Sequence, residues 1–513
     1  MTTLVRGASP TLVRDALTVL QPGFTGTTPP DWLLRRIGEG LSSVGLFGRN
    51  IASAGQLAAL TARLRAERED VLVAIDEEGG DVTRLEARTG SSFPGNLALG
   101  TVDDTGLTRE VAAELGRRLA ACGVDFNWAP SADVNSDPAN PVIGVRSFGA
   151  DPRLAARHTV AYIEGLQSVG VVACTKHFPG HGDTNVDSHL AMPRIDVDLA
   201  TLHARELVPF RAAIEAGSKS VMSAHILLPA LDPDRPATLS PRILTGLLRQ
   251  ELGYEGLIVT DGMEMQAIAS TYGIERGSVL ALAAGADAIC VGGGLADEGI
   301  VLRLRDALVD AVRTGELPEE RLADAAARVR ALASWTRAHR AGGAAAVPGA
   351  ASEAGLAPQP RGGAAPGTGI GLVAARRALR VTGAGEPLTA PAYVAAFAPA
   401  TNIAVGDETP WGVGTELARL MPGTLTGTYA SDAAVERVLG DAGERRIVAV
   451  VRDTHRHPWM ADALDGLLAA RPDTVVVEMG VNQAPARGAL HVATHGAARV
   501  CGIAAAEVVA GAV

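Results

Sequence analysis

The densest group of reactive side chains in this sequence lies in one short stretch, between Cys174 and Pro193. The stretch contains Lys176, His177, His181, Asp183, Asp187 and His189, with Gly180 and Gly182 among them. A packed strand does not end in so many polar groups, because burying each one is costly unless it is paired. The pattern is typical of a loop that performs chemistry at the end of a strand.

Two residues of this loop, Asp187 and His189, are separated by a single residue. A carboxylate beside an imidazole can fix its tautomer and raise its basicity. Because an unperturbed imidazole titrates at a pKa of ~6.5, it can donate and then accept a proton near neutrality. The spacing therefore favours a general acid/base pair.

A further reactive position is Asp261, which lies in Glu255-Gly-Leu-Ile-Val-Thr-Asp-Gly-Met. Its carboxylate directly follows an apolar run, and Gly262 lets the backbone turn away beneath it. A carboxylate held so rigidly suits nucleophilic attack on an anomeric carbon, or electrostatic support of a cation that forms there.

Eight short apolar runs position these residues. Each is followed by polar residues and then by helical periodicity, and the runs lie at Leu17–Phe24, Val44–Phe47, Val71–Asp76, Val124–Trp128, Val171–Thr175, Ser220–Ala224, Leu257–Asp261 and Ala286–Val291. Apolar, non-alternating strands in β-then-α units require a parallel sheet that is buried on both faces. We therefore predict an α/β fold, a (β/α)8 TIM-type barrel followed by a smaller α/β sandwich domain.

Polar residues end five of these strands. Asp76 ends the third, Asn127 the fourth, Lys176 and His177 the fifth, His225 the sixth and Asp261 the seventh. Any single strand-ending aspartate is explained about as well by a cap on the following helix. Five strands together favour one pocket, because barrel enzymes keep their sites at the carboxyl ends of the strands.

Composition divides the chain into a catalytic barrel domain over residues 1–340, a linker over 341–369 and a C-terminal α/β domain over 370–513. The Ala/Gly/Pro-rich linker is too poor in large apolar side chains to form a core. Helices are expected at Gln56–Arg68, Arg109–Cys122, Leu154–Val169, Ala200–Ala216, Pro241–Glu251 and Ala461–Ala470, and strands of the last domain at Tyr393–Phe397, Asn402–Val405, Ile447–Val451 and Thr474–Met479. The stretch Leu302–Arg340, rich in Ala, Leu and Arg, is expected to close the first domain. This domain shows no dense polar cluster, and its histidine pair, His455 and His457, favours a solvated turn.

The charge balance excludes two kinds of partner. Forty-six basic and fifty-seven acidic residues give a formal charge of −11, which opposes nucleic acid and anionic membrane surfaces. We see no export signal and no apolar run that could span a membrane. The four scattered cysteines suggest neither a disulfide framework nor a zinc site, so we expect a cytoplasmic protein without metal or cofactor.

Four blocks together resemble the β-N-acetylglucosaminidase branch of the family-three glycoside hydrolases. They are Lys176-His177-Phe178-Pro179-Gly180-His181-Gly182-Asp183-Thr184 with Asp187-Ser188-His189; Asp76-Glu77-Glu78-Gly79-Gly80; Ile143-Gly144-Val145-Arg146-Ser147-Phe148-Gly149; and Thr260-Asp261. The likeness covers roughly residues 15–340, and the Lys-His…Asp-Ser-His block is specific to that branch. Two-domain members of the family carry an α/β sandwich after the barrel, as expected here.

The resemblance implies a retaining exo-β-N-acetylglucosaminidase. Asp261 would be the nucleophile that forms a covalent glycosyl-enzyme, and His189, oriented by Asp187, would be the general acid/base. The sugar hydroxyls and the N-acetyl group would be held by Asp76, Arg84, Arg146, Lys176 and His177, and Met222 and His225 would line the pocket. The family commonly has arginine where this chain has Asp81, a charge reversal that could change an outer subsite.

The implied substrate is a sugar, a terminal β-linked N-acetylglucosamine of muropeptides or chito-oligosaccharides. The acceptor stays open, because a neutral imidazole does not repel an incoming anion, and phosphate in place of water would make the protein a phosphorylase. Two alternatives belong to other classes. An aldolase-type barrel would use Lys176 as a Schiff base, and a non-catalytic sugar-binding barrel would need neither Asp261 nor His189.

Overall fold

The computed structural model describes residues 8–187, 191–295, 297–344, 369–399, 409–431 and 435–512. They form two compact units. The first contains the described parts of 1–77, 108–134 and 151–364, and the second contains those of 78–107, 135–150 and 365–513. The second unit thus includes two segments that follow the third and fourth strands of the first along the chain. The domain and linker limits inferred from the sequence stay a prediction, and 345–368 lie outside the described residues.

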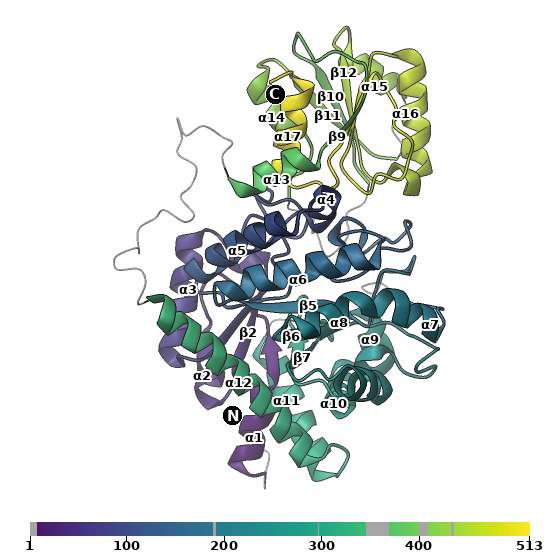
Figure 1. The fold of residues 1–513 in the computed structure, drawn as a ribbon. Coiled ribbons are helices and arrows are strands. Elements are labelled where there is room, and N and C mark those ends of the chain that lie inside the picture. The colour runs from purple at the N-terminus through teal and green to yellow at the C-terminus, as the bar shows by residue number, and fades with distance from the viewer. Residues whose placement is uncertain are drawn as a thin grey trace. The chain divides into compact units, whose positions relative to one another are not determined.

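Eight parallel strands form the centre of the first unit (Figure 1). They are β1 (Leu20–Pro22), β2 (Ser43–Leu46), β3 (Leu72–Ile75), β4 (Phe126–Asn127), β5 (Val172–Phe178), β6 (Ser220–Ser223), β7 (Leu257–Thr260) and β8 (Ile289–Val291). Strands β2 to β7 form one sheet in sequence order, and β1 pairs with β8. A parallel bridge between Val259 and Ala288 joins β7 to β8, and a 2.6 Å hydrogen bond from Gln21 Nε2 to Ser43 Oγ links β1 to β2. The predicted barrel is confirmed.

Most of the strands are shorter than the apolar runs that predict them. The first begins at Leu20 rather than Leu17, because helix α1 (Pro10–Thr18) occupies the start of that run. Ser9 caps this helix by accepting the backbone N–H of Leu12 at 3.1 Å, and Pro10 opens it. A capped helix start therefore overrides the apolar pattern there.

Helices surround the strands of the first unit. They are α2 (Asp31–Glu39), α3 (Ala54–Glu67), α5 (Thr105–Ala121), α6 (Pro152–Ser168), α7 (Leu199–Thr201), α8 (Leu207–Glu215), α9 (Gln266–Tyr272), α10 (Ile274–Ala284), α11 (Glu298–Arg313) and α12 (Glu319–Ala344), with π-helical turns at η3 (Leu202–Glu206) and η5 (Arg242–Glu251) and short 3₁₀ turns at η1 (Gly48–Asn50) and η4 (Ala237–Leu239). The stretch Leu302–Arg340, which we expect to close the first domain, contains most of α11 and α12, which are separate helices. Pro318 lies between them and cannot continue a helix.

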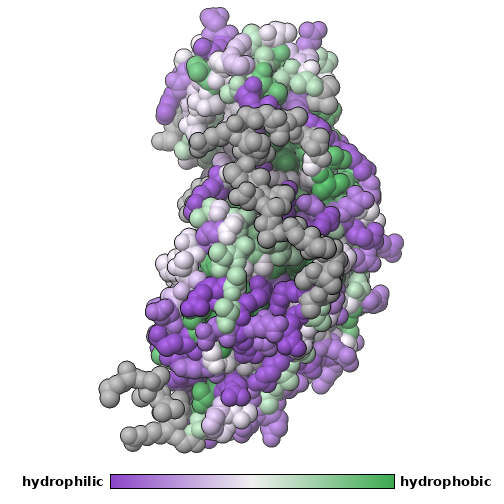
Figure 2. All heavy atoms as spheres, turned by 90° about the vertical axis from the view of Figure 1, so that its left-hand side faces the viewer, coloured by the Kyte–Doolittle hydropathy of each residue, from purple (hydrophilic) through white to green (hydrophobic). Residues whose placement is uncertain are grey.

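The helices of the first unit bury one face and expose the other. Helix α3 buries Leu57, Leu60 and Leu64 and exposes Arg63 and Glu67. On the face drawn in Figure 2, hydrophilic side chains predominate over the helices of the barrel, with smaller apolar areas between them. Among the described residues, no helix has the length and apolar character needed to cross a bilayer.

The second unit is built on a six-stranded sheet in the order β11-β10-β12-β13-β14-β9. Its strands are β9 (Arg380–Gly383), β10 (Tyr393–Phe397), β11 (Leu425–Tyr429), β12 (Ile447–Val451), β13 (Val475–Glu478) and β14 (Leu490–Ala493), and only β9 runs antiparallel to its neighbour. Three strands predicted from the sequence, β10, β12 and β13, are confirmed. The predicted strand Asn402–Val405 lies outside the described residues.

Helices cover both faces of this sheet (Figure 1). They are α13 (Ile370–Ala378), α14 (Gly414–Leu420), α15 (Val435–Ala442), α16 (Pro458–Ala470) and α17 (Arg499–Val509), with a 3₁₀ turn at η6 (Thr454–Arg456). Along β12 the side chains alternate, so that Val448 and Val450 pack with α13, α14 and α17. Ala449 and Val451 pack with α15 and α16 on the opposite face. The result is a three-layered α/β sandwich, as the sequence predicts.

The segments 78–107 and 135–150 pack against this sandwich as parts of the same unit. They contain α4 (Asn96–Val102) and the 3₁₀ turn η2 (Gly144–Arg146). Asp81 is buried, accepts the backbone N–H of Ala497 at 2.7 Å and forms an ion pair with Arg452. Asp81 is thus a structural partner of the C-terminal chain, which accounts for the reversed charge noted in the sequence.

Candidate active site

Three charged side chains lie at or near the carboxyl ends of barrel strands: Asp76 follows β3, Lys176 lies in β5 and Asp261 follows β7. Lys176, in β5, donates from Nζ to Oδ1 of Asp76 at 2.6 Å, and only 2% of Lys176 is exposed. Burial raises the pKa of Cys174 to about 12, and the charges of Lys176, Asp76 and Asp261 also act on this thiol. The structure therefore brings together three residues that the sequence predicts for the site.

Asp133, a carboxylate that the sequence analysis does not single out, organises the histidines of the reactive loop. It is fully buried; its Oδ2 lies 2.6 Å from Nδ1 of His177, and its Oδ1 accepts the backbone N–H of His181 at 2.7 Å. Burial alone would raise the pKa of Asp133, but the charge and hydrogen bond of His177 hold it at about 2. Asp133 thus fixes the His177 ring as a carboxylate partner does. The only sign of this role in the sequence was an acidic residue between the apolar residues Ala132 and Val134, in the segment after β4.

His181 is a neutral imidazole beside this pair. Burial, and then the charge of His177, lower the pKa of His181 to about 4. The two rings lie 5.9 Å apart, nearly edge to face at 72°. The charge of Asp261 also acts on His181, in the direction that raises its pKa.

Asp261 follows β7 and is held by the backbone around it. Its N–H donates to the Ser223 carbonyl at 3.2 Å, and its Oδ1 accepts the N–H of Gly262 at 2.8 Å. His225 is fully buried behind this turn, where its Nε2 donates to the Gly262 carbonyl at 3.0 Å. His225 therefore supports the turn that carries Asp261. Met222 packs in the barrel interior.

The turn after Asp261 has a further support that the sequence analysis missed. Glu264 Oε1 accepts the backbone N–H groups of Gly292 at 2.8 Å and Gly294 at 3.3 Å, with that of Gly293 between them. These glycines follow β8, so the carboxylate joins the ends of two neighbouring strands. Successive glycines after a strand are the sequence signal for such an anion-binding backbone.

The reactive loop is anchored by residues at the end of η3, just before α8. Asp183 forms an ion pair with Arg205, whose Nε also donates to Glu206 at 2.5 Å. Glu206 is buried, and burial raises its pKa to about 7. Further along the loop, Asp187 accepts the backbone N–H of Ala191 at 3.0 Å through its carbonyl. The predicted acid/base residue, His189, lies outside the described residues.

Two predicted sugar contacts, Arg84 and Arg146, belong to the second unit. Arg146 is buried and binds Glu78 with two nitrogens, Nη2 to Oε1 at 2.7 Å and Nε to Oε2 at 3.0 Å. Glu78 thus fixes the Arg146 guanidinium, a role that the sequence analysis does not assign. Arg84 is partly exposed. Their roles toward a sugar stay predictions.

This arrangement can bind and attack a polyhydroxylated ligand. The ammonium of Lys176 and the carboxylate of Asp76 place a donor and an acceptor side by side, which suits neighbouring hydroxyl groups. The hydrogen bond from the Gly262 N–H fixes the Asp261 carboxylate, as a carboxylate nucleophile requires. Within the described ranges, no three histidine, cysteine, aspartate or glutamate side chains are placed to hold one metal ion.

Comparisons with known proteins find relatives in both sequence and structure. The model of the glycosyl hydrolase family 3 N-terminal domain matches residues 37–332. Beta-hexosaminidase A of Pseudoalteromonas piscicida is 36% identical over 311 residues, 56% of this chain and 52% of that protein, so the chain spans about half that relative's length. The beta-hexosaminidase of Nitrosomonas eutropha is 35% identical over 304 residues, which cover 57% of this chain and 86% of that protein. The solved family 3 beta-N-acetylglucosaminidase from Paenibacillus sp. str. FPU-7 is 32% identical, with a TM-score of 0.82 over 98% of this chain and 96% of that one.

Proposed function

The chain belongs to glycosyl hydrolase family 3, and on that premise we propose that it is a retaining exo-β-N-acetylglucosaminidase. One observation carries the proposal: Lys176 near the end of β5 donates to Asp76 after β3 at 2.6 Å, and the charges of both residues and of Asp261, which follows β7, act on the same buried thiol. These are motif positions of the β-N-acetylglucosaminidase branch. Relatives named beta-hexosaminidase and beta-N-acetylglucosaminidase support the same activity.

In the proposed mechanism Asp261 attacks the anomeric carbon of the substrate. The bond from that carbon to the leaving oxygen breaks, and His189, as imidazolium, gives the leaving oxygen its proton. His189, now neutral, then takes a proton from water, whose oxygen attacks the same carbon and releases Asp261. Two inversions at one carbon retain the β-configuration. The proposed role of Asp187 is to orient the imidazole of His189.

The remaining predicted residues hold the sugar in this proposal. Asp76 and Lys176 bind ring hydroxyls as a paired acceptor and donor, and His177 binds with an orientation set by Asp133. The aldolase alternative requires a neutral Lys176 amine, which a carboxylate oxygen at 2.6 Å disfavours. The sugar-binding roles of Arg84 and Arg146 rest on the family resemblance alone.

We propose that the substrate is the terminal β-linked N-acetylglucosamine of muropeptides or chito-oligosaccharides. We also propose that the protein acts in the cytoplasm. The four cysteines are free thiols buried in the structure, which agrees with a reducing compartment. Water is the proposed acceptor.

The test is turnover of an aryl β-N-acetylglucosaminide, with the matching aryl β-glucoside as a control, in the absence and presence of phosphate. We expect free N-acetylglucosamine at a rate that phosphate does not change. Asp261→Ala should lower kcat on the order of 10⁴-fold with an unchanged melting temperature. The surface variant Asp234→Ala should retain full activity. Production of a sugar 1-phosphate, or an active Asp261→Ala protein, would refute the assignment.

A further inference from the structure

The second unit contains a pocket of about 690 Å³, including the open solvent at its mouth. The chain runs from β10 to β11 on one side and then crosses to β12 on the other side of β10. The order of the strands therefore reverses between β10 and β12. In open α/β sheets, ligands bind outside the carboxyl ends of the strands at such a reversal. Pro399, two residues after β10, and Arg452, directly after β12, both line the pocket.

The loop after β12 is rigidly held in its shape. Buried Glu478 accepts the backbone N–H of Asp453 at 2.8 Å and the hydroxyl of Thr454 at 2.7 Å. Asp453 has a left-handed backbone, φ 54°, and its Oδ1 accepts the N–H of Val481 at 2.7 Å. A Cβ on Gly480 would lie 2.3 Å from the Asp453 carboxylate, so glycine is required there. The loop is thus preorganised, as binding sites are.

The histidines of this loop are part of the same structure. The sequence predicts a solvated pair, but Nε2 of His455 donates to the Pro138 carbonyl at 2.8 Å, which ties the loop to segment 135–150. His457 lines the pocket, and burial followed by the charge of Arg456 lowers its pKa. This loop therefore contributes Arg452, Asp453, Arg456 and His457 to the pocket lining, and Glu478 of β13 fixes its backbone.

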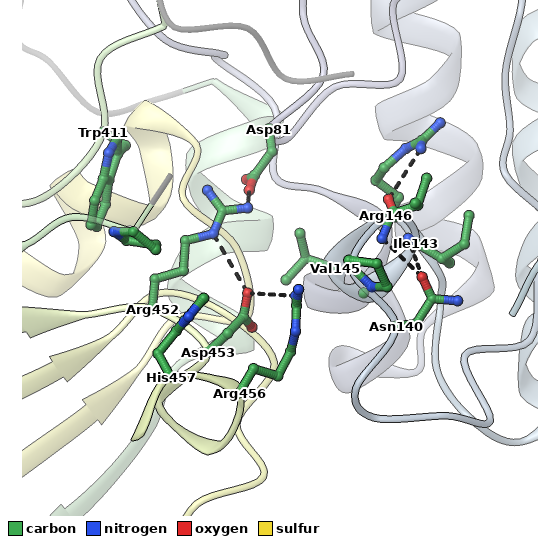
Figure 3. A pocket seen from close by; sticks show the side chains of 14 residues that line it. Asp81, Asn140, Ile143, Val145, Arg146, Trp411, Arg452, Asp453, Arg456 and His457 are labelled. Carbon is green, nitrogen blue, oxygen red and sulfur yellow. Dashed lines mark hydrogen bonds and ion pairs between the residues drawn. The ribbon is translucent and has the colours of Figure 1, made fainter. Parts of the chain in front are cut away.

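Two walls face each other across the pocket (Figure 3). Trp411, Arg452, Asp453, Arg456 and His457 form one wall, and the other comes from residues 140–146. Each arginine that lines the pocket has its own carboxylate partner, so their charges balance: Arg452 pairs with Asp81, Arg456 lies 3.5 Å from Asp453, and Arg146 binds Glu78. Balanced charge gives no preference for an anion such as phosphate. An indole ring beside planar guanidinium and carboxylate groups suits a neutral ring that carries hydroxyl groups.

We infer that this pocket binds a neutral sugar residue, namely an N-acetylglucosamine unit of the oligosaccharide substrate. The choice of sugar rests on the proposed function. Trp411 provides a face for the sugar ring, and Arg456 and Asp453 bind its hydroxyl groups.

The test is calorimetric titration with tetra-N-acetylchitotetraose, using Asp261→Ala protein so that the ligand is not consumed. Adding Trp411→Ala or Arg456→Ala should weaken binding about tenfold, because truncated Trp and Arg side chains are the ones that most often dominate binding. Trp411→Phe, which keeps a ring, should weaken it less. Arg419→Ala is the matched control, since Arg419 lies on α14 outside the pocket and pairs with Glu416 at 3.0 Å.

The outcomes separate this inference from the proposed function. Binding of chitotetraose that is the same in all variants with native melting temperatures would overturn the sugar site. Binding of inorganic phosphate that Arg456→Ala abolishes, without any effect on chitotetraose, would also overturn it. In the chain with intact Asp261, absent turnover of the aryl β-N-acetylglucosaminide together with Trp411-dependent sugar binding would refute the proposed function and support the pocket.

Discussion

Asp133 shows how one buried carboxylate can order a reactive loop. It binds the Nδ1 of His177 and the backbone N–H of His181, and Ser131 Oγ donates to it at 3.0 Å. A carboxylate that accepts several hydrogen bonds in the folded state prefers its charged form there. Its pKa of about 2 lies below the ordinary value of 3.8, so ionised Asp133 stabilises the fold.

Asp133→Asn should therefore change how stability depends on pH. Because the folded-state pKa is depressed, the contribution of Asp133 is complete above about pH 4 and is lost as the pH falls toward 2. The advantage of the wild-type protein over Asp133→Asn in free energy of unfolding should shrink by about 2 kcal/mol between pH 5 and pH 2. Urea unfolding across this range measures it.

Asp196→Asn serves as the control for this experiment. Asp196 is exposed and pairs only with the exposed Arg194, at 2.8 Å. Its removal should leave the pH profile of unfolding unchanged, since exposed ion pairs contribute little. Equal profiles for Asp133→Asn and Asp196→Asn would contradict the role of Asp133.

At the scale of helices and strands, the strands could be predicted from the sequence. The buried carboxylates that hold the loops after them could not. Apolar runs such as Leu257–Asp261 show that a strand is buried, and its end follows from the first polar residue. Asp76 and Asp261 were found in this way, since each directly follows a strand, whereas β5 continues past Lys176 to Phe178. Asp133 and Glu264 were missed because their partners, a histidine side chain and glycine backbone, come from other strands. Local patterns do not contain such pairings.

The loop after β5 is held by the residues where η3 joins α8, and Arg205 is the link. Arg205→Ala should lower kcat/KM for an aryl β-N-acetylglucosaminide about tenfold, because Asp183, Asp187 and His189 share this loop and small displacements of catalytic groups are costly. The melting temperature should change little, since the Arg205–Asp183 pair is partly exposed, 26% and 32% for the two side chains.

Arg194→Ala provides a matched control for Arg205→Ala. Arg194 follows the same loop, but it is more than half exposed and pairs with Asp196. Its removal should leave kcat/KM unchanged, and Arg205→Lys should recover part of the loss. Identical kinetics for the two alanine variants would show that the Asp183 contact does not position the loop.

Glu206, next to Arg205, should make the protein less stable as the pH rises. Its pKa is raised from 4.5 to about 7 by burial, so the folded state binds a proton that the unfolded state has released. The destabilisation of the folded protein by buried Glu206 therefore grows between about pH 4.5 and pH 7. Relative to wild type, Glu206→Gln should gain about 3 kcal/mol in free energy of unfolding from pH 4 to pH 8. A constant difference across this range would mean that Glu206 is charged in the folded protein.

At the scale of the whole molecule, the compact units do not follow the order of the chain. Asp81 pairs with Arg452 across 371 residues, and Arg499 donates to Ser92 Oγ at 2.7 Å. The sequence suggests division at a linker because composition changes there. Contacts over such separations leave no compositional mark, so the assignment of 78–107 and 135–150 to the second unit required the structure.

A chain truncated after Ala344 should therefore keep the barrel strands but lose the order of these two segments. Without the C-terminal chain, Asp81 loses both Arg452 and the Ala497 N–H, and Thr101 loses a 2.9 Å bond from Arg380. A carboxylate that has lost its partners favours an exposed conformation. Limited proteolysis with mass spectrometry should detect new cleavage within 78–107 and 135–150, while the strands stay protected. Activity should fall as well, because Arg84 and Arg146 lie in these segments. A truncated protein with the intact chain's cleavage pattern would show that both segments fold without the C-terminal sheet.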